Sequence, residues 1–210
     1  METTRWWWVR HAPVTGHDGR IYGNRDVACD CSDTAVFRGL AGQLPDQAAW
    51  VVTPLGRTRQ TAEAIVNHHP AEPEFDVEPH LAEQNFGNWQ GMTYAELDQQ
   101  REGDWHRFWL APAEETPPGG ESFATVCQRV AGAVSRLNQR FSGRDIICVS
   151  HGGPIRAALG HALGLTPEAA LAFSIDNCAL TRLDHFAATD GKPESWRVAL
   201  VNGRPHMPGS

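Results

Sequence analysis

Arginine and histidine side chains follow the ends of three apolar segments that lie far apart in the sequence. These side chains are Arg10 and His11 after the first segment, Arg57 after the second and His151 after the third. A neutral imidazole is a nucleophile, and nearby guanidinium groups keep it neutral because they lower its pKa. Guanidinium groups also bind phosphoryl oxygens and stabilise the charge of a phosphoryl-transfer transition state. The four side chains therefore predict a site that handles phosphate.

The apolar segments have the composition of buried strands, and helical patterns separate them. The predicted strands are residues 5–9, 48–52, 144–149, 179–183 and 196–201. Apolar residues spaced three and four apart predict helices, which are residues 57–67, 121–141 and 154–163. This alternation predicts an α/β fold, a three-layer α/β/α sandwich with a mostly parallel central sheet. The three tryptophans of residues 6–8 are then expected to pack on both faces of that sheet.

The predicted topology brings the four side chains together, because ligands of parallel sheets bind at the carboxyl ends of the strands. A single histidine at a strand end is more often structural than catalytic. Three strand ends that converge on cationic and imidazole groups favour a functional site. Gly152 and Gly153 follow His151, and the start of the helix predicted there adds backbone N–H donors for an anion.

Composition limits the partners. The chain has 210 residues, 41% of them hydrophobic, and a formal net charge of −7. This length predicts a single domain, residues 1–210, and the negative charge argues against nucleic acid or an anionic membrane surface as a partner. No segment reaches the roughly 20 apolar residues of a membrane span, and the N-terminus lacks the features of a signal peptide. We therefore expect a cytoplasmic protein with a small phosphorylated metabolite as its partner.

No metal and no cofactor are predicted. The five cysteines include no CxxC pair, and the ten histidines include no HExxH pair, so free thiols and a site without metal are expected. Lys192 is the one lysine of the chain and lies in a turn-like stretch. Arginine and histidine must therefore bind the phosphate.

An acid for the leaving alcohol is harder to assign. Glu83 precedes an aromatic and glycine-containing stretch, so it is a candidate for a partly desolvated general acid. A solvated surface glutamate is the alternative, and composition alone favours it. The residues by themselves predict a phosphate site without an assigned acid.

Four segments resemble the signature segments of the histidine phosphatase superfamily, in its phosphoglycerate mutase-like branch. They are RHAP at 10–13, TPLGRTRQTA at 53–62, LAEQNFGNWQG at 81–91 and VSHGGPIRAAL at 149–159. The resemblance implies the phosphoglycerate mutase-like fold and a reaction without metal. It implies a phosphohistidine on His11 and Glu83 as proton donor and later base. It also implies phosphate contacts, which Arg10, Arg57, His151 and the backbone of Gly152 would make.

The first segment departs from the RHGET pattern of that family. Ala12, Pro13 and Val14 replace its glycine, glutamate and threonine, and His17 stands where the family has asparagine. His17, Thr15 and Asn24 are candidates to replace the lost polar groups. The predicted substrate rim is His17, Tyr22, Asn24 and Arg25, although the stretch from Tyr22 also has the composition of a plain turn.

The segment 104–123 resembles the corresponding part of the alpha-ribazole phosphatases of cobalamin synthesis. Its aromatic residues Trp105, Phe108 and Trp109 permit stacking on a ring of the substrate. Their spacing equally permits a helix face turned to the core, and we favour that alternative. Alpha-ribazole 5'-phosphate is therefore a candidate substrate, and broad specificity remains open.

The sequence thus predicts a metal-independent phosphomonoesterase that hydrolyses a small phosphate ester, as a monomer or homodimer. A cofactor-dependent phosphoglycerate mutase-type phosphotransferase is the near alternative, and the short chain favours the phosphatase. A non-catalytic phosphate-binding protein with this fold is a further alternative. Retention of both histidines, both arginines and the glutamate weighs against it.

Overall fold

A computed structural model describes residues 2–100, 104–189 and 191–205 of the chain. Within these residues the centre is a six-stranded sheet in the order β3-β2-β4-β1-β5-β6. The strands are β1 (Thr3–Arg10), β2 (Ala48–Val52), β3 (Phe75–Val77), β4 (Asp145–Ser150), β5 (Leu180–Phe186) and β6 (Ser195–Gly203). The first four are parallel, and β5 runs antiparallel to both of its neighbours, β1 and β6.

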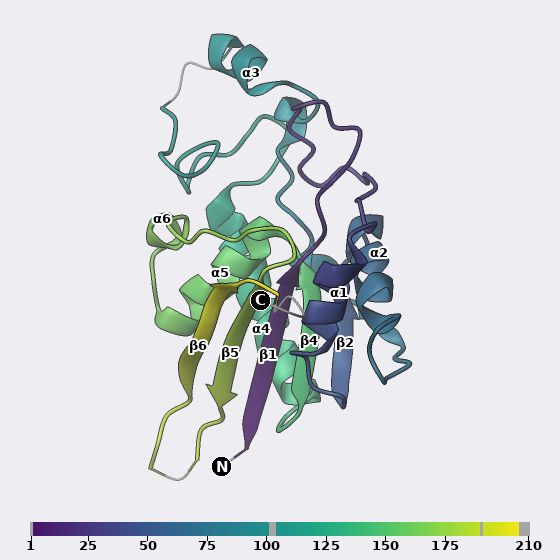
Figure 1. Cartoon of the computed structure of the whole chain (residues 1–210). Helices are drawn as coiled ribbons and strands as arrows, with labels where there is room; N and C mark the ends of the chain where they lie inside the picture. Colours follow the sequence, from purple (N-terminus) through teal and green to yellow (C-terminus); the bar gives the residue numbers. More distant parts are fainter. Residues whose placement is uncertain (1, 101–103, 190, 206–210) are drawn as a thin grey trace.

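Helices cover both faces of the sheet (Figure 1). On one face lie α4 (Phe123–Arg140), α5 (Gly152–Leu163) and the short α6 (Pro167–Ala170), and on the other lie α1 (Thr34–Ala41) and α2 (Gly56–Val66). The predicted three-layer α/β/α sandwich with a mostly parallel sheet is therefore confirmed.

Each face of the sheet has its own core, because successive side chains of a strand point to opposite faces. Trp6 and Trp8 are fully buried with α4 and α5 and stack with ring centroids 4.8 Å apart. Val9 belongs to the core under α1 and α2, and Trp7 packs against that core. The prediction that the three tryptophans pack on both faces is confirmed. The packing on both sides makes the end of β1 rigid.

Short segments form a cap over the carboxyl ends of the strands. We define the cap as residues 13–30, 79–100 and 104–120, and it contains the 3-10 helices Pro79–Leu81 and Gly87–Trp89 and helix α3 (Tyr94–Gln100). It has a small core of its own, which is Ile21, Phe86, Trp89, Leu97, Leu110 and Ala111. The cap therefore holds its shape above the sheet edge where ligands of such folds bind.

The predicted strands and helices are present with shifted ends, and several short elements were not predicted. The elements that sequence reasoning missed are α1, β3, α3, α6 and the 3-10 helices Pro79–Leu81 and Gly87–Trp89. The favoured helix through Trp105, Phe108 and Trp109 is wrong: residues 104–110 contain irregular backbone, a turn and a bend but no helix, and Trp105 and Phe108 are exposed. In the described ranges no helix combines the length and apolarity that a membrane crossing requires.

Candidate active site

His11 directly follows β1 and is fully buried. Its backbone is held on both sides, because its N–H donates to the Ser150 carbonyl (3.0 Å) and its carbonyl accepts from the Asn177 side chain (2.8 Å). The Nδ1 atom of His11 lies 2.7 Å from the Ala12 carbonyl oxygen. A carbonyl only accepts, so Nδ1 bears the proton and the Nε2 lone pair is free.

Burial, as the largest cause, and the charges of Arg57 and Arg10 together lower the pKa of His11 from its usual 6.5 to about 3. The Nε2 atom is buried and has no hydrogen-bond partner among the described residues. The side chain is therefore a neutral imidazole with an unoccupied nucleophilic nitrogen at neutral pH.

His151 lies beside His11, because β1 and β4 are parallel neighbours in register from Arg5 with Asp145 to Arg10 with Ser150. The ring centroids of the two histidines are 5.1 Å apart. His151 Nε2 is 2.9 Å from the Thr53 hydroxyl, while Nδ1 is buried and unpartnered within the described part of the chain. Burial is the main cause that lowers the pKa of His151 well below its usual value, so this ring is also neutral.

Arg57 lies in the first turn of α2 and is fully buried. Its two terminal nitrogens donate to the carbonyls of Arg25 (2.7 Å) and Gly23 (2.8 Å) in the cap. These bonds fix the guanidinium and leave Nε buried without a partner among the described residues. Burial lowers the pKa of Arg57, and the charge of Glu83 opposes that effect.

Arg10, at the end of β1, is oriented by one bond from Nη1 to the Ile175 carbonyl (2.6 Å). Its Nε is also buried and unpartnered in the described structure. Each of the four predicted side chains thus leaves one buried polar atom unsatisfied. Native proteins rarely leave such atoms without a partner, so four of them at neighbouring strand ends indicate a place for a polar ligand.

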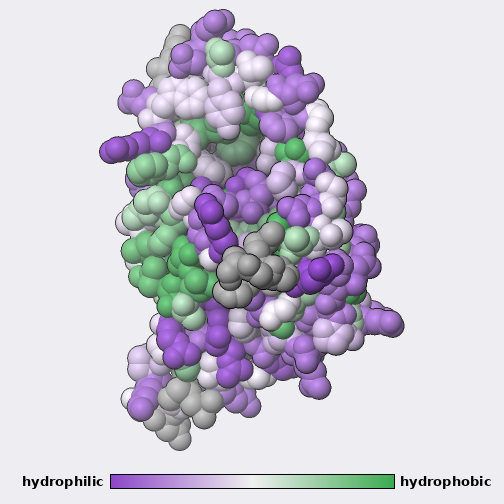
Figure 2. Space-filling model, in the orientation of Figure 1, coloured by the Kyte–Doolittle hydropathy of each residue, from purple (hydrophilic) through white to green (hydrophobic). Residues whose placement is uncertain are grey.

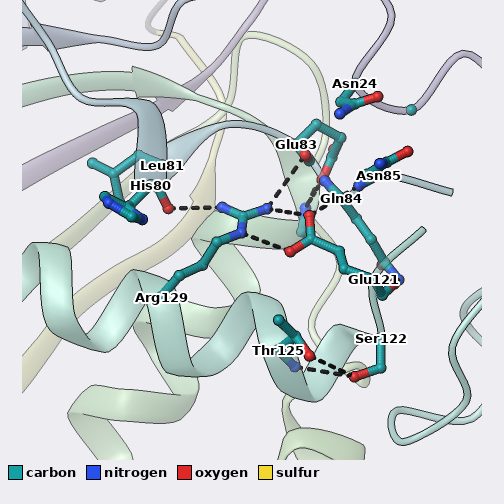
Figure 3. Close-up of polar contacts among 12 residues, drawn as sticks. Asn24, His80, Leu81, Glu83, Gln84, Asn85, Glu121, Ser122, Thr125 and Arg129 are labelled. Carbon is teal, nitrogen blue, oxygen red and sulfur yellow. Dashed lines mark hydrogen bonds and ion pairs between the residues drawn. The ribbon is translucent and has the colours of Figure 1, made fainter. Parts of the chain in front are cut away.

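Glu83 is only 8% exposed, so the reading of this residue as a solvated surface glutamate is wrong. Its Oε1 accepts from the backbone N–H of Gln84 (2.9 Å) and of Gly153 (3.2 Å), at the N-terminus of α5. The positive charges of Arg57 and Arg156 both interact with the Glu83 carboxyl group. Figure 3 shows the Glu83 segment and the polar contacts that surround it.

Gly152 and Gly153 lie between these groups. A Cβ on Gly152 would lie 2.9 Å from Arg156 Nη1, and a Cβ on Gly153 would collide with Glu83 Oε1. Glycine at both positions therefore lets the helix start approach the arginine and the carboxylate closely.

A cavity of about 510 Å³ reaches two of the site residues, Arg10 and Glu83, and extends into the cap, whereas His11, Arg57 and His151 are not among its lining residues. Figure 2 shows the molecule hollowed beneath the cap. The cavity is lined by Arg10 and Glu83, by His17 and Tyr22, and by aromatic side chains that include Tyr94, Trp105, Phe108 and Trp109. Tyr94, Trp105 and Phe108 are among the most exposed large hydrophobic residues described. Exposed aromatic groups around a polar floor form a surface suited to the organic part of a ligand.

Two of the four predicted rim residues, His17 and Tyr22, line this cavity, whereas Asn24 and Arg25 are not among its lining residues. The Asn24 N–H donates to the Gln90 side chain (2.8 Å), and the Arg25 carbonyl accepts from Arg57. The structure therefore places Asn24 and Arg25 where they support the loop that holds Arg57.

Sequence reasoning missed three supporting residues. Thr53 contacts His151, Asn177 holds the His11 backbone, and Thr61 accepts from the Ala12 N–H (2.9 Å). Thr53 and Thr61 lie in one of the signature-like segments, which was a usable signal. Asn177 precedes β5 and had no comparable signal. No group of three or more His, Cys, Asp or Glu side chains suited to a metal ion occurs within the described ranges.

The chain is similar in sequence to curated proteins. Phosphoserine phosphatase 1 of Hydrogenobacter thermophilus is 31% identical over 174 residues, which is 81% of this chain and 82% of that protein. A bifunctional protein of Mycobacterium tuberculosis is 34% identical over 155 residues, which is 74% of this chain. The match spans only 40% of the length of that larger relative.

Solved structures show the same fold. Mycobacterial glucosyl-3-phosphoglycerate phosphatase superposes with a TM-score of 0.81 at 25% identity, over 96% of this chain and 99% of that one. A putative alpha-ribazole-5'-P phosphatase from Escherichia coli superposes with a TM-score of 0.76 at 23% identity, over 96% and 97% of the two chains. The family model of the histidine phosphatase superfamily (branch 1) matches residues 6–200. The chain belongs to the histidine phosphatase superfamily.

Proposed function

We propose that this chain, as one histidine phosphatase domain, hydrolyses a small phosphate monoester without a metal ion. The observation that supports this most strongly is the set of unsatisfied buried atoms on Arg10, His11, Arg57 and His151. A phosphoryl group placed among them would accept hydrogen bonds from the two guanidinium groups. It would also present its phosphorus to the Nε2 lone pair of His11.

In the first step the His11 Nε2 forms a bond to phosphorus while the bond from phosphorus to the alcohol oxygen breaks. Glu83, in its protonated form, gives its proton to the departing oxygen, so the product leaves as a neutral alcohol. His151 donates from Nδ1 to a phosphoryl oxygen when the Thr53 hydroxyl donates to Nε2. The two arginines stabilise the negative charge on the oxygens throughout the transfer.

In the second step a water molecule attacks the phosphohistidine. The Glu83 carboxylate, now ionised, takes one proton from the water as its oxygen bonds to phosphorus. The bond between phosphorus and Nε2 breaks, its electron pair returns to His11, and inorganic phosphate leaves. Both His11 and Glu83 are then in their starting protonation states.

The aromatic lining of the cavity supports an ester whose alcohol contains a flat ring. Tyr94 is 59% exposed and Phe108 53%, and both line the cavity that Glu83 and Arg10 also line. Stacking of a ring on such side chains buries apolar surface without requiring a charged partner. Alpha-ribazole 5'-phosphate has this character and is our candidate substrate, which would place the chain in cobalamin biosynthesis. The proteins of known fold include one described as an alpha-ribazole phosphatase, from Shigella flexneri.

A mutase-type phosphotransferase remains the second candidate. A 2,3-bisphosphoglycerate-dependent phosphoglycerate mutase of Cytophaga hutchinsonii is 31% identical over 116 residues, or 54% of this chain. The same His11 would then pass its phosphoryl group to a hydroxyl of the substrate instead of to water.

The test is hydrolysis of an aryl phosphate in excess chelator by the wild type, His11→Ala and the control His68→Ala, whose residue is exposed. We expect His11→Ala to be inactive and the control to be unchanged. Brief reaction with an ester that carries a radioactive phosphoryl group should label the wild type with an acid-labile, alkali-stable group. Activity of His11→Ala, or complete dependence on added metal, would refute the mechanism.

A second arm addresses the substrate. Alpha-ribazole 5'-phosphate, phosphoserine and 3-phosphoglycerate are compared with and without 2,3-bisphosphoglycerate. We expect Phe108→Ala to raise KM for the ring-bearing ester about tenfold and to leave KM for phosphoserine unchanged. Isomerisation of 3-phosphoglycerate that requires the bisphosphate would identify a mutase instead.

A further inference from the structure

The segment that contains Glu83 is not part of the sheet. Residues 82–86 have no regular secondary structure, so ladder hydrogen bonds do not fix the position of this carboxyl group. General acid catalysis requires the acid within hydrogen-bond distance of the departing oxygen. Other contacts must therefore hold the segment in place.

An ion pair beneath the segment makes those contacts (Figure 3). Arg129 binds Glu121 through two bonds, from Nε to Oε2 (3.0 Å) and from Nη2 to Oε1 (2.9 Å). The same guanidinium donates from Nη1 to the His80 carbonyl (2.7 Å) and from Nη2 to the Glu83 carbonyl (3.3 Å). One arginine thus binds the backbone on both sides of the turn that leads to the acid.

Glu121 completes the connection from its own side. Its Oε1 accepts from the Asn85 N–H (3.0 Å), and its carbonyl accepts from the Gln84 side chain (2.8 Å). Its N–H donates to the Asn85 carbonyl (2.9 Å). Residues before, at and after Glu83 are therefore all bonded to one ion pair.

Helix α4 is a rigid base for the pair. Val126 and Val130 lie on this helix on either side of Arg129 in sequence, and both are fully buried in the core. Ser122 caps the helix by accepting from the Thr125 N–H (3.1 Å), which fixes the residue before it, Glu121. The side chains of Arg129 and Glu121 are only 16% and 21% exposed, so water competes weakly for their bonds.

We propose that the Arg129–Glu121 ion pair positions the Glu83 carboxyl for proton transfer. This inference rests on the proposed role of Glu83 as general acid. It assigns Arg129 and Glu121 as positioning residues, because their bonds reach the backbone of the acid and not the phosphate site.

The pair also adds two opposite charges near the acid. Among the described residues, the other charged or titratable side chains that interact with Glu83 or line the same cavity are Arg57 from α2, Arg156 from α5, Arg10, His17, Arg20, Tyr22, Tyr94, His106 and Arg107. These groups remain in place when the pair is altered. Loss of Glu121 alone leaves an extra cation that favours the ionised carboxylate, whereas loss of Arg129 alone leaves an extra anion that favours the protonated acid.

The experiment measures kcat/KM against pH for an alkyl phosphate and an aryl phosphate, because only the poor alkyl leaving group needs the acid in the first step. The variants are Glu121→Gln, Arg129→Gln, the double variant and Arg129→Lys. Arg136→Gln is the matched control, since Arg136 lies on the same helix as Arg129, pairs with Glu78 at 3.3 Å and is 55% exposed.

We expect both single variants to lose about tenfold in kcat/KM on the alkyl ester and little on the aryl ester. The alkaline limb of the curve of kcat/KM against pH should move to lower pH in Glu121→Gln and to higher pH in Arg129→Gln, each by roughly 0.5 pH unit. In the double variant the limb should return to its wild-type position. Arg129→Lys keeps the charge and loses the two-pronged geometry, so it should lose activity without moving the limb. Arg136→Gln should match the wild type.

Shifts of both single variants in the same direction, or activity losses equal on the two esters, would show that the pair only stabilises the fold. Thermal unfolding of each variant identifies a loss that comes from misfolding. Glu83→Gln separates the two proposals. If it spares the alkyl ester, the role of Glu83 itself is wrong, whereas a selective loss in Glu83→Gln without one in the pair variants refutes only the positioning role.

Discussion

A single methyl group at Gly153 tests the geometry of the acid without changing any charge. The Cβ of Gly153→Ala would overlap Glu83 Oε1, and Trp109 Cζ2 lies 3.7 Å away on another side. The backbone N–H of residue 153 remains, so the hydrogen-bond donor to Glu83 is preserved. The substitution therefore acts on the position of the carboxylate.

The size of the effect follows from the overlap. An ordinary contact requires the carboxylate to move by about 1 Å, and a misplacement of that size costs on the order of 100-fold in rate. Alanine is at least as favourable as glycine in a helix, so the helix itself is not weakened. We expect kcat/KM on an alkyl phosphate to fall about 30- to 100-fold and kcat/KM on an aryl phosphate to fall less than about threefold.

The assay compares the two esters by phosphate release, with Gly132→Ala as the control. Gly132 lies on the exposed side of α4, where a Cβ has only the flexible Arg136 side chain within 3.5 Å. Wild-type rates on the alkyl ester in Gly153→Ala would refute the assignment of Glu83 as the acid. An equal loss on both esters would show that the methyl group disturbs phosphate binding instead.

Two further predictions concern the histidines. Thr53→Val removes the hydroxyl that lies 2.9 Å from His151 Nε2, and we expect about a tenfold loss of kcat because the buried ring loses its orienting partner; unchanged kinetics would show that the hydroxyl is dispensable. The folded-state pKa of His11, lowered from 6.5 to about 3, means that the unfolded chain binds more protons between these values. The corresponding stability is therefore present above about pH 6.5 and is lost as the pH falls toward 3, by up to about 1.4 kcal/mol per pH unit. Thermal unfolding of His11→Asn should depend less on pH between 7 and 5 than that of the wild type, and parallel curves would contradict the low pKa.

Local pattern and one topological rule were enough to predict much of this protein. Apolar runs and helical spacing identified five of the strands and three of the helices near their observed ends, because short apolar runs form buried strands and regularly spaced apolar residues form helices. The rule that ligands bind at the carboxyl ends of parallel strands then placed Arg10, His11, Arg57 and His151 together. The observed pairing of Arg10 with Ser150 across β1 and β4 is the physical basis for that success.

The tertiary structure alone decided how the acid, the cap and the arginines are held. Glu83 is buried because Gly153 and the Arg129–Glu121 pair, 70 and about 40 residues away in sequence, close around it. The carbonyls of Gly23 and Arg25 orient the Arg57 guanidinium by accepting its hydrogen bonds. The exposed rings of Tyr94 and Phe108 line one cavity only after the cap has folded. Burial and hydrogen-bond partners of this kind are long-range properties, whereas the spacing of residues in a sequence reports only the contacts within one element.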